Sequence, residues 1–403
     1  MRIRTALTLL LSIATCSSAA MAVVCPFCDA PFLVMAEQIR ECDHMLLGKW
    51  LGGDKPKGPQ GGTSRFKIVD VAFSTGSRFK SGDTIEIPRY IAGTETATYS
   101  LMGLGERFED WHLPTEVSAE GWRYLAHIPP PVTDPAEQSK RLLYFLEFFE
   151  HPDQMISDDA FAEFAAASYD VVVRLKDELP REKVLTWLQD SRTAAARVGF
   201  YGLLVGLCGN PEDAAILEKK ILILDADFRP GIDGVMAGFV LLTGEQGLRK
   251  LEDAKTRTKV AMNAEGREVE LPFSETYAVM RTLRFLWTYE SDRFTKDRLK
   301  QSMRTCLDRP ELADLVITDL ARWKDWSVQD RLMAMYDDET FSSPAIKLAI
   351  VRYLQYCSRD TGKSSTAETA SLPDHVVKAE RNLKILEEKD PRTVGDAKRS
   401  LLR

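Results

Sequence analysis

The sequence predicts an α+β chain of several domains, in which a small β-rich domain precedes a longer all-α domain. Three observations indicate this order. Short apolar runs alternate with polar residues and glycines over residues 44–128, a pattern typical of strands. A proline-rich connector follows at 128–135. Beyond it, apolar residues recur at helical spacing almost to the end of the chain.

The first 22 residues have the composition of an export signal. Two arginines precede an apolar segment at 6–14, and Ala20-Met21-Ala22 provides a small-x-small cleavage site. We expect residues 1–22 to be removed and the chain to be periplasmic or extracellular. A lipid anchor on Cys16 and an uncleaved anchor are the alternatives. No later segment is long and apolar enough to span a membrane.

Composition places the chain among ordinary globular proteins. It has 403 residues, of which 44% are hydrophobic and 28% are charged, with a net charge of −7. The acidic balance provides no basic field for a polyanion, so we expect no nucleic-acid partner.

The β-rich domain is assigned to residues 23–130. A helix is expected at 31–42, and the glycine- and proline-rich stretch 52–62 is expected to be an exposed loop. Five short strands are expected after the helix, and the clearest lie at 45–51, 66–71, 84–87 and 98–102. Several short strands with one buried face predict a small barrel or sandwich.

The helical domain is assigned to residues 131–358, and it repeats a unit of two helices joined by a Pro- or Asp-containing turn. The second helices of the units are expected to begin near Asp153, Thr193, Gly231, Glu275, Pro310 and Pro344. A period of about 40 residues is typical of HEAT or armadillo arrays, so we predict a HEAT-like solenoid. An irregular helical bundle is the alternative. Residues 359–403 are read as a polar linker followed by a helix at 376–389.

Three cysteines and a histidine lie close together after the signal: Cys25, Cys28, Cys42 and His44. A thioredoxin-type site needs a strand before its reactive cysteine, and only the signal junction precedes Cys25. A zinc site is disfavoured because the Cys-x-His pair lacks the usual spacing of a second ligand pair. An exported chain favours a disulfide instead.

We therefore predict a disulfide among Cys25, Cys28 and Cys42. A bridge to Cys42 would contribute more than one between Cys25 and Cys28, about 3 kcal/mol by the loop-entropy relation. Three further cysteines end apolar helices and are interpreted as buried small hydrophobic residues: Cys208, Cys306 and Cys357.

One polar and aromatic cluster is a candidate for partner binding. It comprises Asp319, Arg322, Trp323 and Trp326. The two tryptophans share a helix face if the helix continues through them, and Trp and Arg are favoured at interface hot spots. The alternative, which the sequence favours, is a tryptophan-capped corner between helices with an internal Asp–Arg pair.

Four phrases carry a resemblance to other proteins: CPFC at Cys25, SDDAFAEFA at Ser157, FYGLLVGLCG at Phe200 and RPELADLVITDLARWKDWS at Arg309. With them, the chain resembles a group of uncharacterised exported proteins of planctomycete-type bacteria. The first domain resembles, more weakly, netrin-like and other OB-type barrels, in which closely spaced cysteines precede the first strand. In metalloprotease inhibitors of that class the N-terminal residue is itself cysteine. Here Val23 and Val24 would precede Cys25, so that mode of inhibition is not implied.

These patterns predict an exported, non-enzymatic scaffold that binds a protein or envelope component through its helical repeats. No catalytic residue, cofactor site or metal site is assigned. The alternatives are a thiol–disulfide oxidoreductase that uses Cys25 and Cys28, or an N-terminal domain stabilised by zinc.

Signal cleavage is directly testable. Cleavage after Ala22 should give a mature chain that begins at Val23, because the small-x-small motif ends there. N-terminal sequencing of the protein recovered from its producing cells checks this. An intact Met1 would contradict the prediction, and palmitate labelling at Cys16 would indicate the lipid-anchored alternative.

Overall fold

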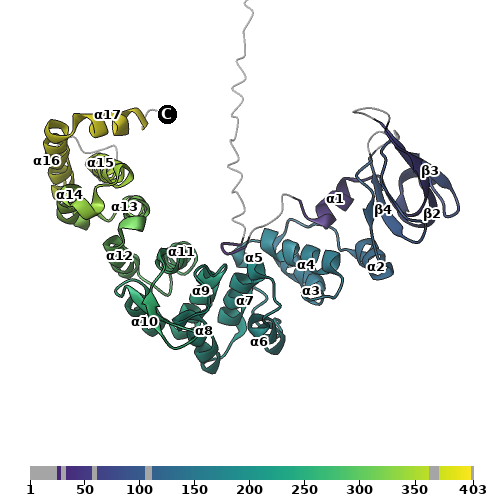
Figure 1. The fold of residues 1–403 in the computed structure, drawn as a ribbon, viewed down its shortest axis with the longest axis horizontal. Helices are drawn as coiled ribbons and strands as arrows, with labels where there is room; N and C mark the ends of the chain where they lie inside the picture. Colours follow the sequence, from purple (N-terminus) through teal and green to yellow (C-terminus); the bar gives the residue numbers. More distant parts are fainter. Residues whose placement is uncertain (1–24, 29–32, 57–60, 105–110, 363–371, 401–403) are drawn as a thin grey trace, which may run out of the picture.

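The computed structural model describes residues 25–28, 33–56, 61–104, 111–362 and 372–400. The predicted signal at 1–22 lies outside these residues. An antiparallel sheet occupies one end of the molecule, and the helices follow one another along an arc (Figure 1). The α+β order expected from the sequence is therefore confirmed.

The sheet follows helix α1 (Met35–Glu41) and has five strands in the order β3-β2-β1-β4-β5. These strands are β1 (His44–Asp54), β2 (Thr63–Ser74), β3 (Thr84–Ile87), β4 (Thr98–Gly103) and β5 (Thr115–Glu116). All neighbouring pairs are antiparallel. Since β3 and β5 each pair on one side only, the described strands form an open sheet and not the expected closed barrel.

The alternation of buried apolar and exposed polar side chains explains why the sequence predicted these strands. Along β2, Phe66 and Ile68 are fully buried, whereas Arg65 and Lys67 between them are exposed. Successive side chains of a strand point to opposite faces, so one face supplies the core. The same core contains side chains from the neighbouring strands and from Trp111.

Helix α2 (Ala119–His127) was not expected from the sequence. The Ser118 hydroxyl caps it by accepting a hydrogen bond from the Gly121 amide at 2.8 Å. Its apolar side chains belong to the core of the helical part, and Trp122 Nε1 also donates to Asp70 of β2 at 2.7 Å. The helical core thus begins one helix before the proline-rich connector.

Six helices begin within three residues of the starts expected for the second helices of the repeats. They are α4 (Gln154–Ala166), α7 (Ala195–Cys208), α9 (Ile232–Thr243), α11 (Phe273–Tyr289), α13 (Ala313–Arg322) and α15 (Pro344–Arg359). Figure 1 shows α7, α9 and α11 toward the inner side of the arc, with α8 and α10 toward the outer side.

The remaining helices are mostly partners of these six. They are α3 (Pro135–Leu146), α5 (Tyr169–Val173), α6 (Arg181–Gln189), α8 (Ala214–Leu222), α10 (Glu245–Lys255), α12 (Lys296–Thr305), α14 (Gln329–Asp337), α16 (Asp374–Lys389) and α17 (Pro391–Ser400). A small sheet of β6 (Ile223–Leu224), β7 (Val260–Asn263) and β8 (Glu268–Glu270) was not expected. Within the described residues, no helix is long and apolar enough to cross a membrane.

Helix α4 attaches the N-terminal domain to the helices through buried polar groups. Asp159 accepts hydrogen bonds from the Met35 amide of α1 at 3.0 Å and from the Tyr124 hydroxyl of α2 at 2.7 Å. One turn further, Glu163 forms a two-pronged ion pair with Arg141 of α3. These contacts explain why a helix buried on several sides retains carboxylates.

Helices α7 and α9 contact each other through their backbones. A Cβ atom on Gly202 would lie 2.5 Å from the Cα of Val235, and one on Gly206 would lie 2.5 Å from the Cα of Gly238. A Cβ on Gly238 would overlap the carbonyl oxygen of Gly202. Three glycines of α7 face two glycines of α9 and the glycine just before it, and they permit a contact that no other residue type allows: Gly199, Gly202 and Gly206 against Gly231, Gly234 and Gly238.

Replacing one of these glycines should destabilise the fold. Gly238→Ala should lower the free energy of unfolding by about 3 kcal/mol, because the new methyl meets backbone atoms that no rotamer change can move. Gly395→Ala in α17 is the matched control, since the nearest atom to its Cβ is the flexible end of Arg399 at 3.7 Å. The control should leave the free energy of unfolding unchanged or raise it by up to about 1 kcal/mol. Urea denaturation measures both, and equal effects would contradict the assignment.

Candidate functional site

The CPFC segment forms a disulfide-closed loop on the inner side of the helical arc (Figure 1). The bond joins Cys25 and Cys28. The Cys25 amide donates to the carbonyl oxygen of Ala165 at 3.2 Å, and Arg281 of α11 donates to the carbonyl oxygen of Pro26 at 3.0 Å. The loop therefore fastens the N-terminal segment to two helices far apart in sequence.

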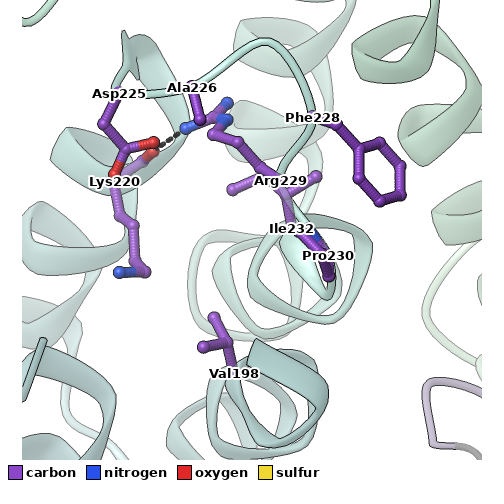
Figure 2. A pocket seen from close by; sticks show the side chains of 8 residues that line it. All are labelled: Val198, Lys220, Asp225, Ala226, Phe228, Arg229, Pro230 and Ile232. Atoms are coloured by element: carbon purple, nitrogen blue, oxygen red, sulfur yellow. Dashed lines mark hydrogen bonds between the residues drawn. The ribbon is translucent and has the colours of Figure 1, made fainter. Parts of the chain in front are cut away.

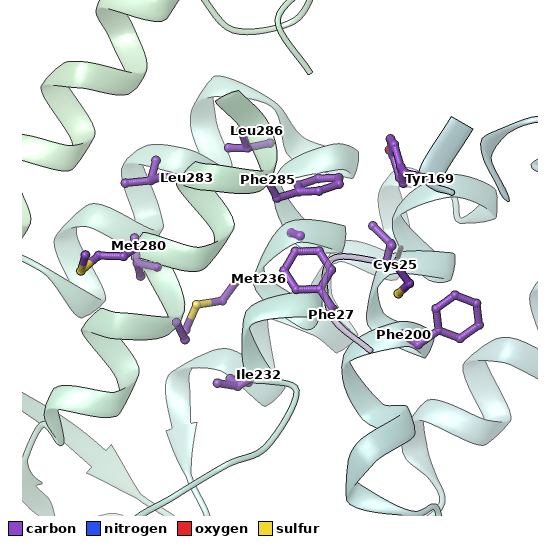
Figure 3. Packing of buried hydrophobic residues seen from close by; sticks show 14 of the residues in the cluster. Cys25, Phe27, Tyr169, Phe200, Ile232, Met236, Met280, Leu283, Phe285 and Leu286 are labelled. Carbon is purple, nitrogen blue, oxygen red and sulfur yellow. The ribbon is translucent and has the colours of Figure 1, made fainter. Parts of the chain in front are cut away.

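Phe27 anchors this loop in the apolar core between helices (Figure 3). Its ring centroid lies 5.2 Å from that of Phe285 in α11, and Phe285 also contacts Tyr169 of α5 at 5.0 Å. Phe27 is 6% exposed and Cys25 is 7% exposed. Burial of Cys25 indicates a structural role for the bridge.

Cys42 does not take part in a disulfide. It ends α1, and its thiol lies 3.1 Å from the carbonyl oxygen of Gln38 in the same helix. Burial raises the pKa of the Cys42 thiol to about 11, with the charges of two neighbouring carboxylates adding to the effect. The bridge expected to involve Cys42 is therefore replaced by one within CPFC, which closes a much smaller loop. The other free cysteines include Cys306 and Cys357, which are fully buried among apolar side chains.

The side chains considered as zinc ligands serve other contacts. His44 shares a hydrogen bond of 3.0 Å with Ser74, and its ring packs against Phe79 and Trp111. Across the described part of the chain, no three His, Cys, Asp or Glu side chains gather as a metal site would require.

A cavity of about 340 Å³ lies beside the CPFC loop, where the N-terminal ends of α7, α9 and α11 meet. We call it the central cavity. Its lining includes Phe27 from the CPFC loop, Arg229 from the segment before α9, Ile232 at the start of α9, and Tyr277 and Arg281 from α11. A neighbouring cavity of about 290 Å³ shares four of its lining residues, Phe228, Arg229, Pro230 and Ile232 (Figure 2).

Two aromatic side chains are exposed beside these cavities. Phe228 is 70% exposed and Phe273, at the start of α11, is 55% exposed. Their segments are adjacent because the Ser274 hydroxyl lies 3.4 Å from the carbonyl oxygen of Asp227. Exposed aromatic side chains next to a cavity are typical of recognition surfaces.

Arg229 holds the loop between the two cavities in place. Its guanidinium donates to Glu275 of α11, with the Nε–Oε1 distance at 2.9 Å, and to the carbonyl oxygens of Ile221 and Ile223. Figure 2 shows its further hydrogen bond to the carbonyl oxygen of Lys220. Every donor direction of the guanidinium is thereby used for structure.

Glu275 pairs with a second buried cation. The Nζ atom of Lys255 in α10 lies 2.9 Å from its Oε2, and both side chains are 1% exposed. Burial alone would raise the pKa of Glu275, but the hydrogen bond from Arg229 and the charge of Lys255 hold it below its usual value. Burial lowers the pKa of Lys255 despite this carboxylate.

The candidate partner-binding cluster proves to be a corner between helices. Helix α13 ends at Arg322, and Lys324 has a left-handed backbone with φ of 53°, so the helix does not continue to Trp326. Trp323 is 7% exposed and stacks on Trp287 of α11 with ring centroids 4.2 Å apart. Asp319 is 2% exposed and accepts a hydrogen bond from Arg284.

The rest of the cluster divides into one contact residue and one exposed charge. Trp326 is half-buried, donates to Asp360 at 2.7 Å and packs edge-on against Tyr353. The side chain of Arg322 is 72% exposed. Of the proposed partner-binding residues, only Arg322 is therefore freely exposed, because Asp319 is buried in ion pairs.

Comparison with protein-family models, with curated proteins and with solved structures gave no match to this chain.

Several residues of the central cavity were not recognised from the sequence. Phe228, Arg229 and Pro230 line both cavities and lie between them. The sequence feature that could have indicated these residues is a phenylalanine among polar residues, directly before the turn Arg229-Pro230-Gly231. No sequence feature marked Glu275 or Arg281 as cavity residues, because their roles depend on which helices become neighbours.

The buried charge cluster predicts a large loss of stability on neutralisation. Glu275→Gln should lower the free energy of unfolding by about 3 kcal/mol, because it leaves Lys255 and Arg229 buried without a carboxylate. Adding Lys255→Met to this variant should restore part of the loss.

The matched control removes a carboxylate from a surface pair. Glu387 lies 2.7 Å from Lys398, and both side chains are more than half exposed. Glu387→Gln should cost less than about 0.5 kcal/mol. Thermal and urea denaturation compare the variants, and an equally small loss for Glu275→Gln would refute the buried-cluster account.

Proposed function

We propose that this chain is an exported, non-enzymatic interaction protein that binds a partner protein on the inner side of its helical arc. In this proposal the paired helices act as a HEAT-like solenoid, and the N-terminal sheet domain is a module of OB or netrin-like type. The resemblance to exported planctomycete-type proteins supports the location, which we propose to be periplasmic or extracellular.

The central cavity with its exposed aromatic side chains carries the proposal. Phe228 and Phe273 expose apolar rings to solvent beside a cavity that Phe27 and Tyr277 help to line. Burying an exposed aromatic ring against a partner gains the hydrophobic free energy of a large surface at little cost in side-chain entropy. Arg281 adds a half-exposed charge at the rim.

The arrangement of charges supports binding better than catalysis. The titratable groups at this cavity are committed to one another: Glu275 to Arg229 and Lys255, and Asp233 to Arg281 at 2.8 Å. A general acid or base must exchange its proton with a substrate, and these partners already occupy the groups. We therefore assign them to holding the cavity walls.

Photo-crosslinking tests this proposal. A benzoylphenylalanine in place of Phe228 should form a discrete adduct with an envelope or secreted protein in cells that produce the chain, because the ring points to solvent beside the cavity. Mass spectrometry identifies the adduct. The same group in place of Ile385, an exposed apolar residue of α16, is the control and should not form that adduct. Absence of an adduct at position 228, or the same adduct at both positions, would refute the proposal.

A further inference from the structure

A third cavity adjoins the two at the start of α9 and lies against α6 and α8. We call it the lysine cavity, and its volume is about 530 Å³. It shares two lining residues with the cavity of about 290 Å³, which in turn shares four with the central cavity. The three cavities therefore adjoin in a row. The lining of the lysine cavity includes Leu188 of α6, Ile216, Lys219 and Lys220 of α8, Ile223 of β6, and Asp225.

The lysine cavity presents two ammonium groups that are not used for structure. Among the residues that the structure describes, neither the ammonium of Lys219 nor that of Lys220 has a hydrogen-bonding or ionic partner. The nearby Glu218 is already paired with Lys250 at 2.7 Å. Asp225 is the one carboxylate in the lining, and Figure 2 shows the Lys220 side chain extending away from it.

This cavity is therefore locally positive on an acidic protein. Two lysines and one carboxylate line it, whereas the whole chain has a net charge of −7. A local positive field attracts an anionic group while most of the surface repels it. An ammonium that is held at a cavity without a partner forms a charge-assisted hydrogen bond with a carboxylate that reaches it.

The other part of the lysine cavity is apolar. Leu188 is 1% exposed, and Ile216 and Ile223 are half-buried. An inorganic anion would leave these aliphatic side chains uncovered. A peptide that carries a carboxylate also brings methylene groups and neighbouring side chains, and these gain free energy by contact with an apolar wall.

We infer that the partner places an extended peptide segment along the three cavities, with an apolar side chain in the central cavity and a carboxylate at Lys219 and Lys220. This inference rests on the proposed binding function and specifies the chemistry of the partner. Phe228 and Lys220 lie on opposite sides of Arg229 (Figure 2), so a segment that contacts both has to be extended. Because Arg229 spends its hydrogen bonds on Glu275 and Lys220, it does not compete with the lysines for the carboxylate.

Peptides that carry one Phe and one Glu test the inference. Fluorescein-labelled peptides with Gly-Ser spacers of increasing length between the two residues should bind the full mature chain best at one spacing, because the distance between the cavities is fixed. In the best peptide, replacing Glu by Gln or Phe by Ala should weaken binding about tenfold. Fluorescence anisotropy gives the dissociation constants.

A double lysine variant locates the carboxylate. Lys219→Gln, Lys220→Gln should bind the Glu and Gln peptides equally, about tenfold more weakly than the unaltered chain binds the Glu peptide. The matched control is Arg381→Gln, Lys384→Gln, which removes two exposed charges from α16 and should leave the affinity within about twofold. Circular dichroism checks folding. If the lysine variant does not fold, Lys219→Gln alone decides, because this side chain is exposed and its loss should still weaken binding several-fold.

Three results would overturn the inference. They are equal affinity of the unaltered chain for the Glu and Gln peptides, an affinity that does not vary with the spacer, and an equal loss in the lysine and control variants. The crosslink at position 228 separates these outcomes from the proposed function. If the adduct still forms while the Glu and Gln peptides bind alike, the interaction function stands and the assigned partner chemistry is wrong.

Discussion

The backbone contact between α7 and α9 is the constraint on which the helical part depends. Helix α9 is buried along almost its entire length, and it also contacts α8, α10 and α11. The glycines bring α7 so close that the two axes have little freedom to shift. Because α9 links the first and second halves of the array, this fixed spacing also determines where α7, α9 and α11 end. The walls of the central cavity are those ends.

Buried charge then fixes the loops that the helices leave between them. Arg229 connects the start of α9 to Glu275 in α11, and Arg304 of α12 forms paired hydrogen bonds with Asp325 after α13. Such pairs add little net stability compared with apolar packing, but each specifies one arrangement, since a mispaired buried ion is costly. The ion pairs thereby fix the conformation of the turns, and the cavities between the turns can keep a constant shape.

The sequence predicted elements better than it predicted contacts. Strand β2 and the starts of the second helices could be found because burial on one face imposes a period on the sequence. Helix α2 was missed because it is short and lies directly after the strands. Trp326 was wrongly placed on the helix of Trp323, because the residue with left-handed backbone at the helix end is Lys324 and not the glycine that usually marks such an end. The exposed side chains beside the central cavity and its neighbour follow no regular spacing in the sequence, so no pattern predicts them.

The phrases that carried the resemblance illustrate the same limit. The segment beginning at Ser157 supplies Asp159 and Glu163 to buried polar contacts, and the one beginning at Phe200 supplies glycines to the α7–α9 contact. The segment beginning at Arg309 supplies the ring of Trp323 to a stacked pair. A sequence shows that such residues are unusual, but the partner residue that gives each one its role lies 22 or more positions away.

The position of the CPFC loop has a consequence for the order of events during synthesis. Pro26 is held by Arg281, 255 residues later, and Phe27 packs on Phe285. A chain made from its N-terminus therefore exposes the CPFC loop long before α11, which contacts it, has been made. The strands and helices α2 to α4, in contrast, can pack against parts of the chain that have already emerged. The CPFC loop can be enclosed only after α11, which is made about 250 residues later, has emerged. Contacts of such sequence separation slow folding, so the nascent chain spends this interval with the Phe27 ring available to other proteins.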